Sequence, residues 1–146
     1  MNDMNFHLTA RIRHQFTFTA DDKTLNKILK DISDRGVSFT AATITKLQNT
    51  NLVRIVVGPP QSNDPEENEV VRDVLCSEGV RFKEEKVIQI LGLVTGTTGV
   101  LSGIYDALFH KVKVKAIYYG ENNAIIVNVS DVKIALRLLE ANGIIG

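Results

Sequence analysis

The sequence lacks most of the features that mark specialised classes of protein. Its 146 residues contain one cysteine, Cys76, so an internal disulfide framework is excluded. We expect Cys76, which follows Leu75 on a predicted helix, to be a small core or boundary residue. No apolar run is long enough to cross a bilayer, and the polar start Met1–Met4 has no signal-peptide core. We therefore expect a cytoplasmic protein that does not associate with a membrane.

Basic and acidic residues are equally frequent in the sequence. Lysine and arginine together number 17, as do aspartate and glutamate, so the formal net charge is zero. A chain with balanced charge has no global attraction to nucleic acid or to an anionic membrane, and we predict no nucleic-acid partner. The apolar fraction of 44% is normal for a folded globular protein.

Groups that carry chemistry are also scarce. The three histidines do not stand at metal-ligand spacing from a cysteine or a carboxylate: His7, His14 and His110. Asp21 and Asp22 are adjacent acids without partner residues for catalysis, so we assign them to the start of a helix. Neither a phosphate-binding loop with lysine nor a dinucleotide-binding glycine pattern is present. We predict no catalytic residue, no metal and no cofactor.

What the sequence does contain is one stretch around which the rest is organised, residues 86–101. A nearly continuous apolar run there suits a strand buried on both faces: Val87, Ile88, Ile90, Leu91, Leu93 and Val94. The uncharged turn Thr95–Gly99 comes next. Val100, Ile104 and Leu108 then recur at helical spacing. A buried strand is therefore expected to lead through a Gly/Thr turn into a helix.

The start of this helix is the best candidate for a binding site. Free backbone N–H groups and the positive end of the helix dipole lie there, and both suit an anion such as an amino-acid carboxylate. The alternative is that the glycines only permit a tight connection between strand and helix. In a ligand site, the N–H groups from Gly96 to Leu101 would meet the carboxylate, and Val100 and Leu101 would pack on the ligand's side chain. The predicted ligand-binding residues are Thr95, Gly96, Thr97, Thr98, Gly99, Val100 and Leu101.

Predicted elements follow the same order in both halves of the chain: strand, helix, strand, strand, helix, strand. The expected strands cover residues 7–18, 37–47, 52–57, 80–85, 86–94, 111–119 and 124–129, with a further start at Ile144–Ile145. The expected helices cover residues 22–35, 65–78, 100–109 and 131–142. This duplication predicts an α+β fold of two ferredoxin-like βαββαβ units, each an antiparallel sheet with helices on one face. We place the two domains at 1–84 and 85–146.

With these motifs placed, the sequence resembles the tandem ACT-domain proteins, which are ligand-sensing modules of amino-acid metabolism. The resemblance is carried by Ile88-Gln89-Ile90-Leu91-Gly92, Thr97-Thr98-Gly99-Val100-Leu101, the hairpin Gly120–Asn123 and Ala135-Leu136-Arg137-Leu138-Leu139. In the family an Asp or Asn and then Pro-Gly usually precede the helix, whereas here Thr98 precedes Gly99. Thr95 and Thr97 are the nearest polar substitutes for the residue that would grip a ligand's amino group. The first half departs further, because Ala20-Asp21-Asp22 stands where the glycine turn belongs.

The resemblance implies two ACT-like domains and a non-catalytic regulatory protein. Such a protein would bind an amino acid or a similar small metabolite at an interface between ACT-like units. Each half has a thin core, and the strand that starts at Ile144–Ile145 would leave an edge to cover, so we expect a homodimer or larger homo-oligomer. A second hypothesis is a protein–protein assembly module with no small-molecule ligand. An enzyme is the third and weakest hypothesis.

Overall fold

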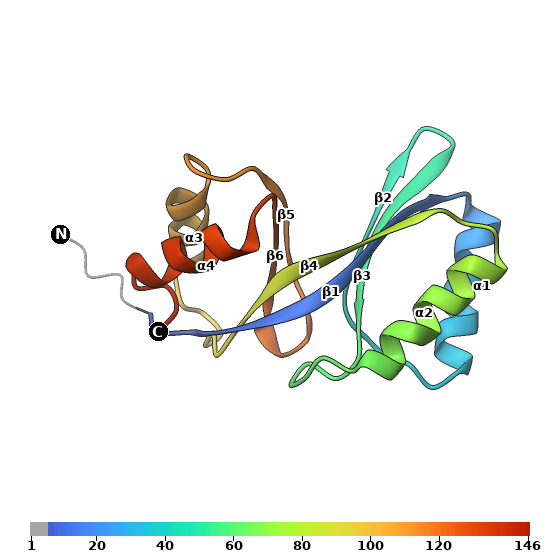
Figure 1. Ribbon diagram of the computed structural model, residues 1–146, viewed down its shortest axis with the longest axis horizontal. Helices are drawn as coiled ribbons and strands as arrows, with labels where there is room; N and C mark the ends of the chain where they lie inside the picture. Colours follow the sequence, from blue (N-terminus) through green and yellow to red (C-terminus); the bar gives the residue numbers. More distant parts are fainter. Residues whose placement is uncertain (1–5) are drawn as a thin grey trace. The chain divides into compact units, whose positions relative to one another are not determined.

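The computed structural model of the protein describes residues 6–146 (Figure 1). Its strands are β1 Thr9–Ala20, β2 Phe39–Leu47, β3 Thr50–Val57, β4 Phe82–Leu91, β5 Val114–Tyr119 and β6 Ile125–Val129. Its helices are α1 Asp22–Asp34, α2 Pro65–Ser77, α3 Val100–Leu108 and α4 Val132–Ala141, and a short 3₁₀ turn covers Glu121–Asn123. The segment Met1–Met4, in which no signal peptide was expected, lies outside the described residues.

The predicted α+β fold class is confirmed. The strands are hydrogen-bonded in the order β2-β3-β1-β4-β6-β5. The pairs β1–β3, β2–β3, β4–β6 and β5–β6 are all antiparallel. Two short turns connect neighbouring antiparallel strands. Residues 48–49 join β2 to β3, and residues 120–124, which contain the 3₁₀ turn, join β5 to β6. This is the ferredoxin-like arrangement that the alternation of strand and helix signals predicts.

The chain divides into two compact units. One unit is Arg13–Glu85, and the other is Lys86–Gly146 together with the N-terminal segment up to Ile12. The first unit contains β1 from Arg13 onward, α1, β2, β3, α2 and the start of β4, which is a complete βαββαβ set. In the second unit, β4, α3, β5, β6 and α4 follow in order, and the first residues of β1 provide the strand beside β4. The domains 1–84 and 85–146 stay a prediction, and the compact units differ from them in where the N-terminal strand belongs.

The core of the unit Arg13–Glu85 forms where the two helices cover the sheet. Asp21 caps α1 by accepting a hydrogen bond from the Thr24 N–H at 2.8 Å. The apolar stripe of this helix is buried as its spacing predicts: Leu25, Ile28 and Ile32. Helices α1 and α2 lie side by side, and Phe16 of β1 packs on Phe82 of β4 with ring centroids 5.9 Å apart.

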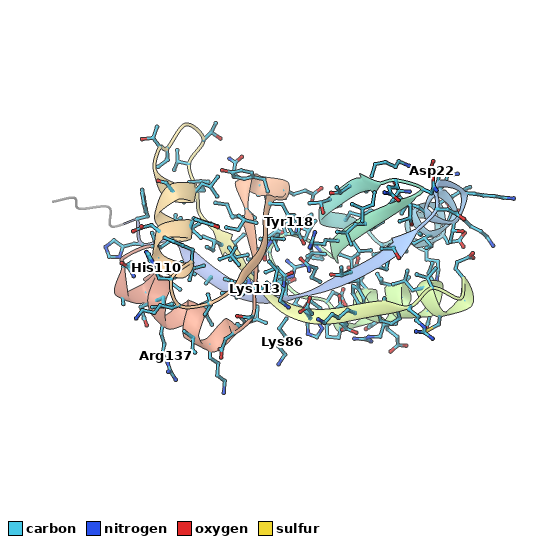
Figure 2. All side chains as sticks on the ribbon, turned by 90° about the horizontal axis from the view of Figure 1, so that it is seen from above. Asp22, Lys86, His110, Lys113, Tyr118 and Arg137 are labelled. Carbon is cyan, nitrogen blue, oxygen red and sulfur yellow. The ribbon has the colours of Figure 1, made fainter. Side chains whose placement is uncertain are left out.

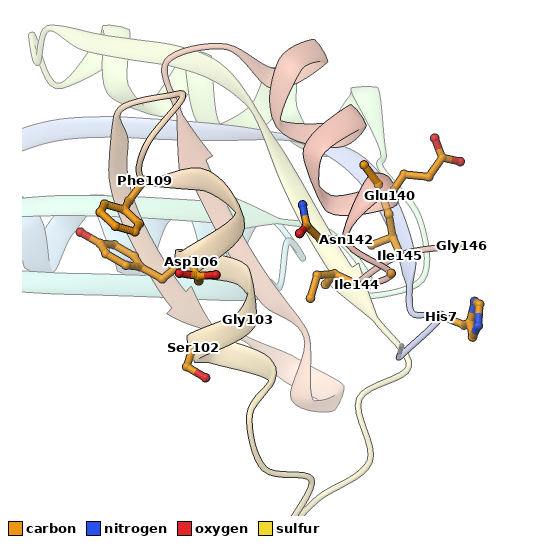
Figure 3. A pocket seen from close by; sticks show the side chains of 13 residues that line it. His7, Ser102, Gly103, Asp106, Phe109, Glu140, Asn142, Ile144, Ile145 and Gly146 are labelled. Carbon is orange, nitrogen blue, oxygen red and sulfur yellow. The ribbon is translucent and has the colours of Figure 1, made fainter. Parts of the chain in front are cut away.

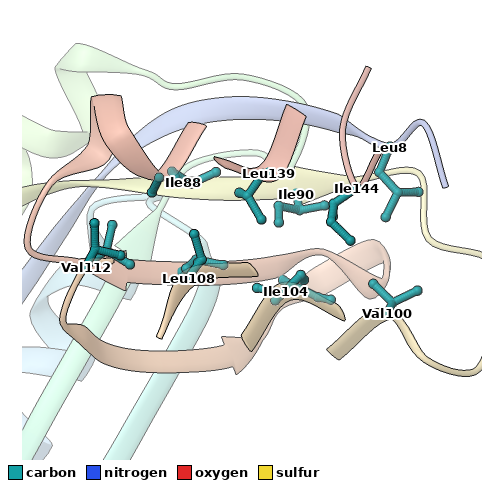
Figure 4. Packing of buried hydrophobic residues seen from close by; sticks show 13 residues of the cluster. Leu8, Ile88, Ile90, Val100, Ile104, Leu108, Val112, Leu139 and Ile144 are labelled. Carbon is teal, nitrogen blue, oxygen red and sulfur yellow. The ribbon is translucent and has the colours of Figure 1, made fainter. Parts of the chain in front are cut away.

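The core of the other unit is built around β4 and α3 (Figure 4). Ile88 and Ile90 of β4 are fully buried, as are Ile104 and Leu108 of α3. Leu139 of α4 packs in the same cluster. The strand expected at Ile144–Ile145 is present as a short parallel bridge: the Leu8 N–H donates to the Ile144 carbonyl at 2.9 Å, and the Gly146 N–H donates to the Leu8 carbonyl at 3.1 Å.

The structure differs from the sequence-based expectation at two places in the sheet. The strands expected at 80–85 and 86–94 are a single strand, β4, which ends at Leu91 because Gly92 adopts φ 94° and turns the chain. Apolar and polar residues alternate along the sequence of β1, but burial does not follow this alternation throughout. Arg13 and Gln15 stand on the polar parity but are buried, and Arg13 Nη2 donates to the Val57 carbonyl at 2.8 Å.

Candidate functional site

The candidate site is the loop between β4 and α3 together with the first turn of α3. Gly96 has φ 89° and Gly99 has φ 84°, both in the left-handed region that favours glycine. Gly99 is the N-cap residue of α3, and the Gly103 N–H donates to the Gly99 carbonyl at 2.9 Å as the first hydrogen bond of the helix. The N–H groups of Val100 to Ser102 precede that bond and point out of the helix end.

The start of α3 differs from the other helix starts that the structure describes. The helices α1, α2 and α4 are each capped by an aspartate side chain: Asp21, Asp64 and Asp131. Among the described residues, no side chain caps α3, and its first turn holds no acid. The positive end of this helix dipole can therefore interact with a negative group from outside the helix.

The predicted site residues are open to solvent, with one exception. Residues 95–98 are exposed, Gly99 is half-buried, and the Leu101 side chain is 44% exposed. Val100 is only 2% exposed and packs in the core with Ile104. Its side chain therefore cannot contact a ligand's side chain, although its backbone N–H faces the helix end. The ligand-binding role of residues 95–101 stays a prediction.

The structure adds one residue to this region, Asn123. It follows the left-handed Asn122 in the 3₁₀ turn between β5 and β6, and it has φ 59° itself. Asn123 Nδ2 donates to Thr95 Oγ1 at 2.7 Å, so the hairpin turn meets the loop before α3. The hairpin is visible in the sequence, but no spacing rule links its tip to Thr95, because the contact depends on how the strands pair.

The equivalent turn before α1 is occupied by the chain's own side chains. Asp22, labelled in Figure 2, forms an ion pair with Lys46 and accepts from Asn51 Nδ2 at 2.8 Å. The hydrogen bond from Lys46 and then that from Asn51 lower the pKa of Asp22. The Thr24 N–H similarly lowers the pKa of Asp21. The expectation that these acids serve the helix start is confirmed for Asp21, which is the N-cap.

The remaining candidate groups are dispersed. His7 and His110 are exposed, and His14 Nδ1 lies 2.6 Å from Glu84 Oε2. The described residues contain no group of three histidine, cysteine, aspartate or glutamate side chains that could hold a metal ion. Cys76 is exposed, so its predicted core or boundary position is wrong: the buried face of α2 is formed by its neighbours Val74 and Leu75, and Cys76 points away from it.

Comparisons with known proteins establish the fold. No protein-family model matches the sequence, and no curated protein matches it either. A protein from Bacteroides thetaiotaomicron has a TM-score of 0.67 at 16% identity, covering 90% of this chain and 89% of that one. The regulatory subunit of aspartate kinase from Thermus thermophilus, in its ligand-free form, has a TM-score of 0.63 at 15% identity, covering 96% of this chain and 97% of that one.

This chain has the fold of an aspartate kinase regulatory subunit. E. coli aspartokinase III in complex with lysine and aspartate also contains it, with a TM-score of 0.55 at 12% identity, covering 94% of this chain and 32% of that one. At these identities the match concerns the fold, and it agrees with the ACT-like arrangement expected from the sequence. Among the described residues, no helix has both the length and the hydropathy needed to cross a membrane.

Proposed function

We propose that the protein is a non-catalytic regulatory protein that binds an amino acid or a similar small metabolite at the start of α3. The ligand would lie between two ACT-like units, with residues 95–101 and Asn123 on one side. Its binding would change how those units pair, which is how a small ligand alters a regulatory assembly. The proposal agrees with the fold shared with a regulatory subunit of aspartate kinase.

The observation that carries the proposal is the contrast between α3 and the other helices. Three helix starts are capped by aspartates of the chain, whereas Gly99 offers no side chain to cap α3. The N–H groups of Val100, Leu101 and Ser102 can therefore donate hydrogen bonds to a carboxylate. Such an anion at a helix N-terminus contributes about 0.3–1 kcal/mol at an exposed site and up to about 2 kcal/mol when partly buried.

The neighbouring groups fit the rest of an amino acid. Asn123 donates one amide hydrogen to Thr95, which leaves its amide oxygen as an acceptor for the ligand's ammonium group. This amide takes the place of the Asp or Asn that ACT-domain proteins usually carry before the helix. The exposed Leu101 side chain offers an apolar contact for the ligand's side chain. One structure with the same fold, aspartokinase III, was solved in complex with lysine and aspartate.

The openness of the loop supports a site that is completed by a second unit. Residues 95–98 are exposed, so one unit alone would leave a bound amino acid largely in water. Small-molecule sites usually bury most of the ligand surface. We therefore propose that the protein is a homodimer or larger homo-oligomer in its ligand-bound form.

A charge placed on the helix start provides the sharpest test. Ser102 is exposed in the first turn of α3, where a glutamate would interact favourably with the helix dipole and would repel a carboxylate. Ser102→Glu should keep or raise the melting temperature of the free protein and remove the stabilisation by amino acids in a thermal-shift screen. Ser102→Gln is the uncharged control of the same size and should retain the stabilisation.

The second candidate function is an assembly module without a ligand. It is favoured by the large apolar side chains exposed toward the C-terminal end of α3, Tyr105 and the C-cap residue Phe109. If none of the twenty amino acids shifts the melting temperature of the unmodified protein, while light scattering shows an oligomer, the assembly function replaces the sensor function.

A further inference from the structure

Helix α3 and its C-cap residue Phe109 expose a row of large apolar side chains. Leu101, Tyr105 and Phe109 follow one another at four-residue spacing and are 44%, 51% and 45% exposed. The rings of Tyr105 and Phe109 are stacked, with centroids 5.5 Å apart and planes 6° from parallel. Single exposed apolar residues are ordinary, but a contiguous row on one short helix marks an interaction surface. We call these three residues the α3 ridge.

A groove runs beside the α3 ridge (Figure 3). One wall is α3, and the other is the end of α4 with the segment 143–146. The segment lies close to the helix because Gly103 has no side chain: a Cβ there would stand 3.1 Å from Ile144 Cδ1. The groove has a volume of about 1260 Å³ and is open to solvent, whereas small-molecule pockets hold roughly 300–1,000 Å³. Its size and openness suit a segment of a macromolecule.

Two acidic side chains line the groove. Asp106 of α3 and Glu140 of α4 contribute carboxylates. Asn142 donates to the Leu138 carbonyl at 2.7 Å, which leaves its amide oxygen as a further acceptor, and Ser102 donates to the Gly99 carbonyl at 3.2 Å. Among the described residues that line the groove, none is lysine or arginine. His7 and Tyr105 also line the groove, but no lysine or arginine described there pairs with the two carboxylates, so a basic occupant would supply the opposite charge.

We propose that the α3 ridge and the adjacent groove form a docking surface for an amphipathic helix of a partner protein that carries lysine or arginine. The apolar face of that helix would pack on Leu101, Tyr105 and Phe109. Its ammonium or guanidinium groups would bind Asp106 and Glu140 as charge-assisted hydrogen bonds. This is the helix-in-groove mode, in which apolar anchors provide affinity and flanking charges set the register.

A second copy of this chain whose α3 runs antiparallel fits the surface less well. When two copies pair through α3 about a two-fold axis that makes the helices antiparallel, each flank of the ridge faces the same flank of the other copy. The carboxylates of Asp106 and Glu140 would then face the same carboxylates, and like charges oppose binding. A basic partner meets the two acids with opposite charge.

Two synthetic peptides test the proposal on the full chain. Both are amphipathic helices of about 18 residues with leucine on one face, and the polar face carries lysine in one and glutamate in the other. Titration into the ¹⁵N-labelled protein should shift the amide signals of residues 101–109 and 140–146 with the lysine peptide only. Raising the salt concentration should weaken binding, because the contacts are ionic.

Matched variants assign the binding to this surface. Asp106→Asn with Glu140→Gln should weaken the lysine peptide about tenfold or more, because two charge-assisted contacts are lost. Glu121→Gln removes the same type of charge from an exposed position outside the groove and should change the affinity less than twofold. Tyr105→Ser with Phe109→Ser should weaken binding at least as strongly, and Tyr119→Ser, which alters an exposed aromatic residue elsewhere, should not.

Three outcomes would overturn the proposal. The first is equal binding of the glutamate peptide, which needs no change in the protein and is therefore independent of any folding defect in a variant. The second is an equal loss of affinity in the Glu121→Gln control. The third is a dimer in light scattering that Tyr105→Ser with Phe109→Ser converts into a monomer, because a second copy would then be the occupant of the ridge.

Discussion

The two turns that lead from a strand into a helix, before α1 and before α3, have the same place in their units and opposite chemistry. Before α1, Asp21 caps the helix and Asp22 is paired with Lys46 and Asn51. Before α3, glycine and threonine leave the helix start without a side-chain partner among the described residues. One turn has been closed by the chain itself, and the other is available to a ligand. We propose that only the turn before α3 binds a ligand.

The largest expected effect tests whether the two units are separate bodies. Ile28 of α1 and Ile104 of α3 are both fully buried, each in the core of its own unit. Ile28→Ala and Ile104→Ala should each lower the free energy of unfolding by about 2–5 kcal/mol. Hydrogen exchange should accelerate mainly in residues 13–85 for the first variant and in 86–146 for the second. Equal acceleration of hydrogen exchange in both units would contradict the view that they are separate bodies.

The next effect concerns the backbone of the open turn. Gly99 has φ 84°, and a β-branched residue in the left-handed region is strained by about 1–3 kcal/mol. Gly99→Val should therefore lower the melting temperature and abolish stabilisation by a ligand. Gly99→Asn is the control, because asparagine tolerates this region, and it should keep most of the stability. A Gly99→Val variant that still responds fully to the ligand would contradict the site.

Acid should weaken the unit Arg13–Glu85 through its ion pairs. The bidentate hydrogen bonds from Arg72, at 2.7 and 2.9 Å, lower the pKa of Glu84, with His14 acting in the same direction. A carboxylate whose folded pKa is depressed adds stability above its unfolded pKa, and this stability is lost as the pH falls through the folded value. The melting temperature should thus decline below about pH 4.5, where an unperturbed glutamate is about half protonated. Glu84→Gln should make that decline shallower, and an unchanged acid profile would count against the ion pair.

The smallest effect is expected at the closed turn. Asp22 is exposed, and its partners Lys46 and Asn51 lie on β2 and β3. Asp22→Ala should cause only a small drop in melting temperature, because exposed ion pairs add little. Its response to a ligand should equal that of the unmodified protein. A variant that lost the ligand response would place the site before α1 instead.

Local patterns in the sequence account for much of the fold. The spacing of Leu25, Ile28 and Ile32, and that of Val100, Ile104 and Leu108, predicts the buried stripes of α1 and α3. The N-terminal strand was harder to place, because the alternation from Leu8 to Phe18 continues without a break while residues on either side of Ile12 belong to different units. The local sequence does not show which neighbouring strand each part of β1 pairs with. The division of β1 between the two units therefore depends on tertiary structure.

The candidate site was predictable in its position and less so in its details. The Gly/Thr turn and the helix start are visible in the sequence. Val100 belongs to the apolar stripe with Ile104 and Leu108, so the helical spacing itself predicts that Val100 is buried. The prediction that its side chain packs on a ligand conflicted with that spacing. Asn123 could not be assigned, because its contact with Thr95 joins residues 28 positions apart through strand pairing.

The most direct measurement is an amide NMR titration of the ¹⁵N-labelled protein with pooled amino acids and, separately, with the corresponding amino-acid amides, which lack the carboxylate. Binding at the open turn predicts saturable shifts of the Gly99, Val100, Leu101 and Ser102 amides with the acids, weak or no shifts with the amides, and unchanged Asp22 and Thr24 signals. Shifts confined to Asp22 and Thr24, equal responses to acids and amides, or no response at the start of α3 would contradict the account.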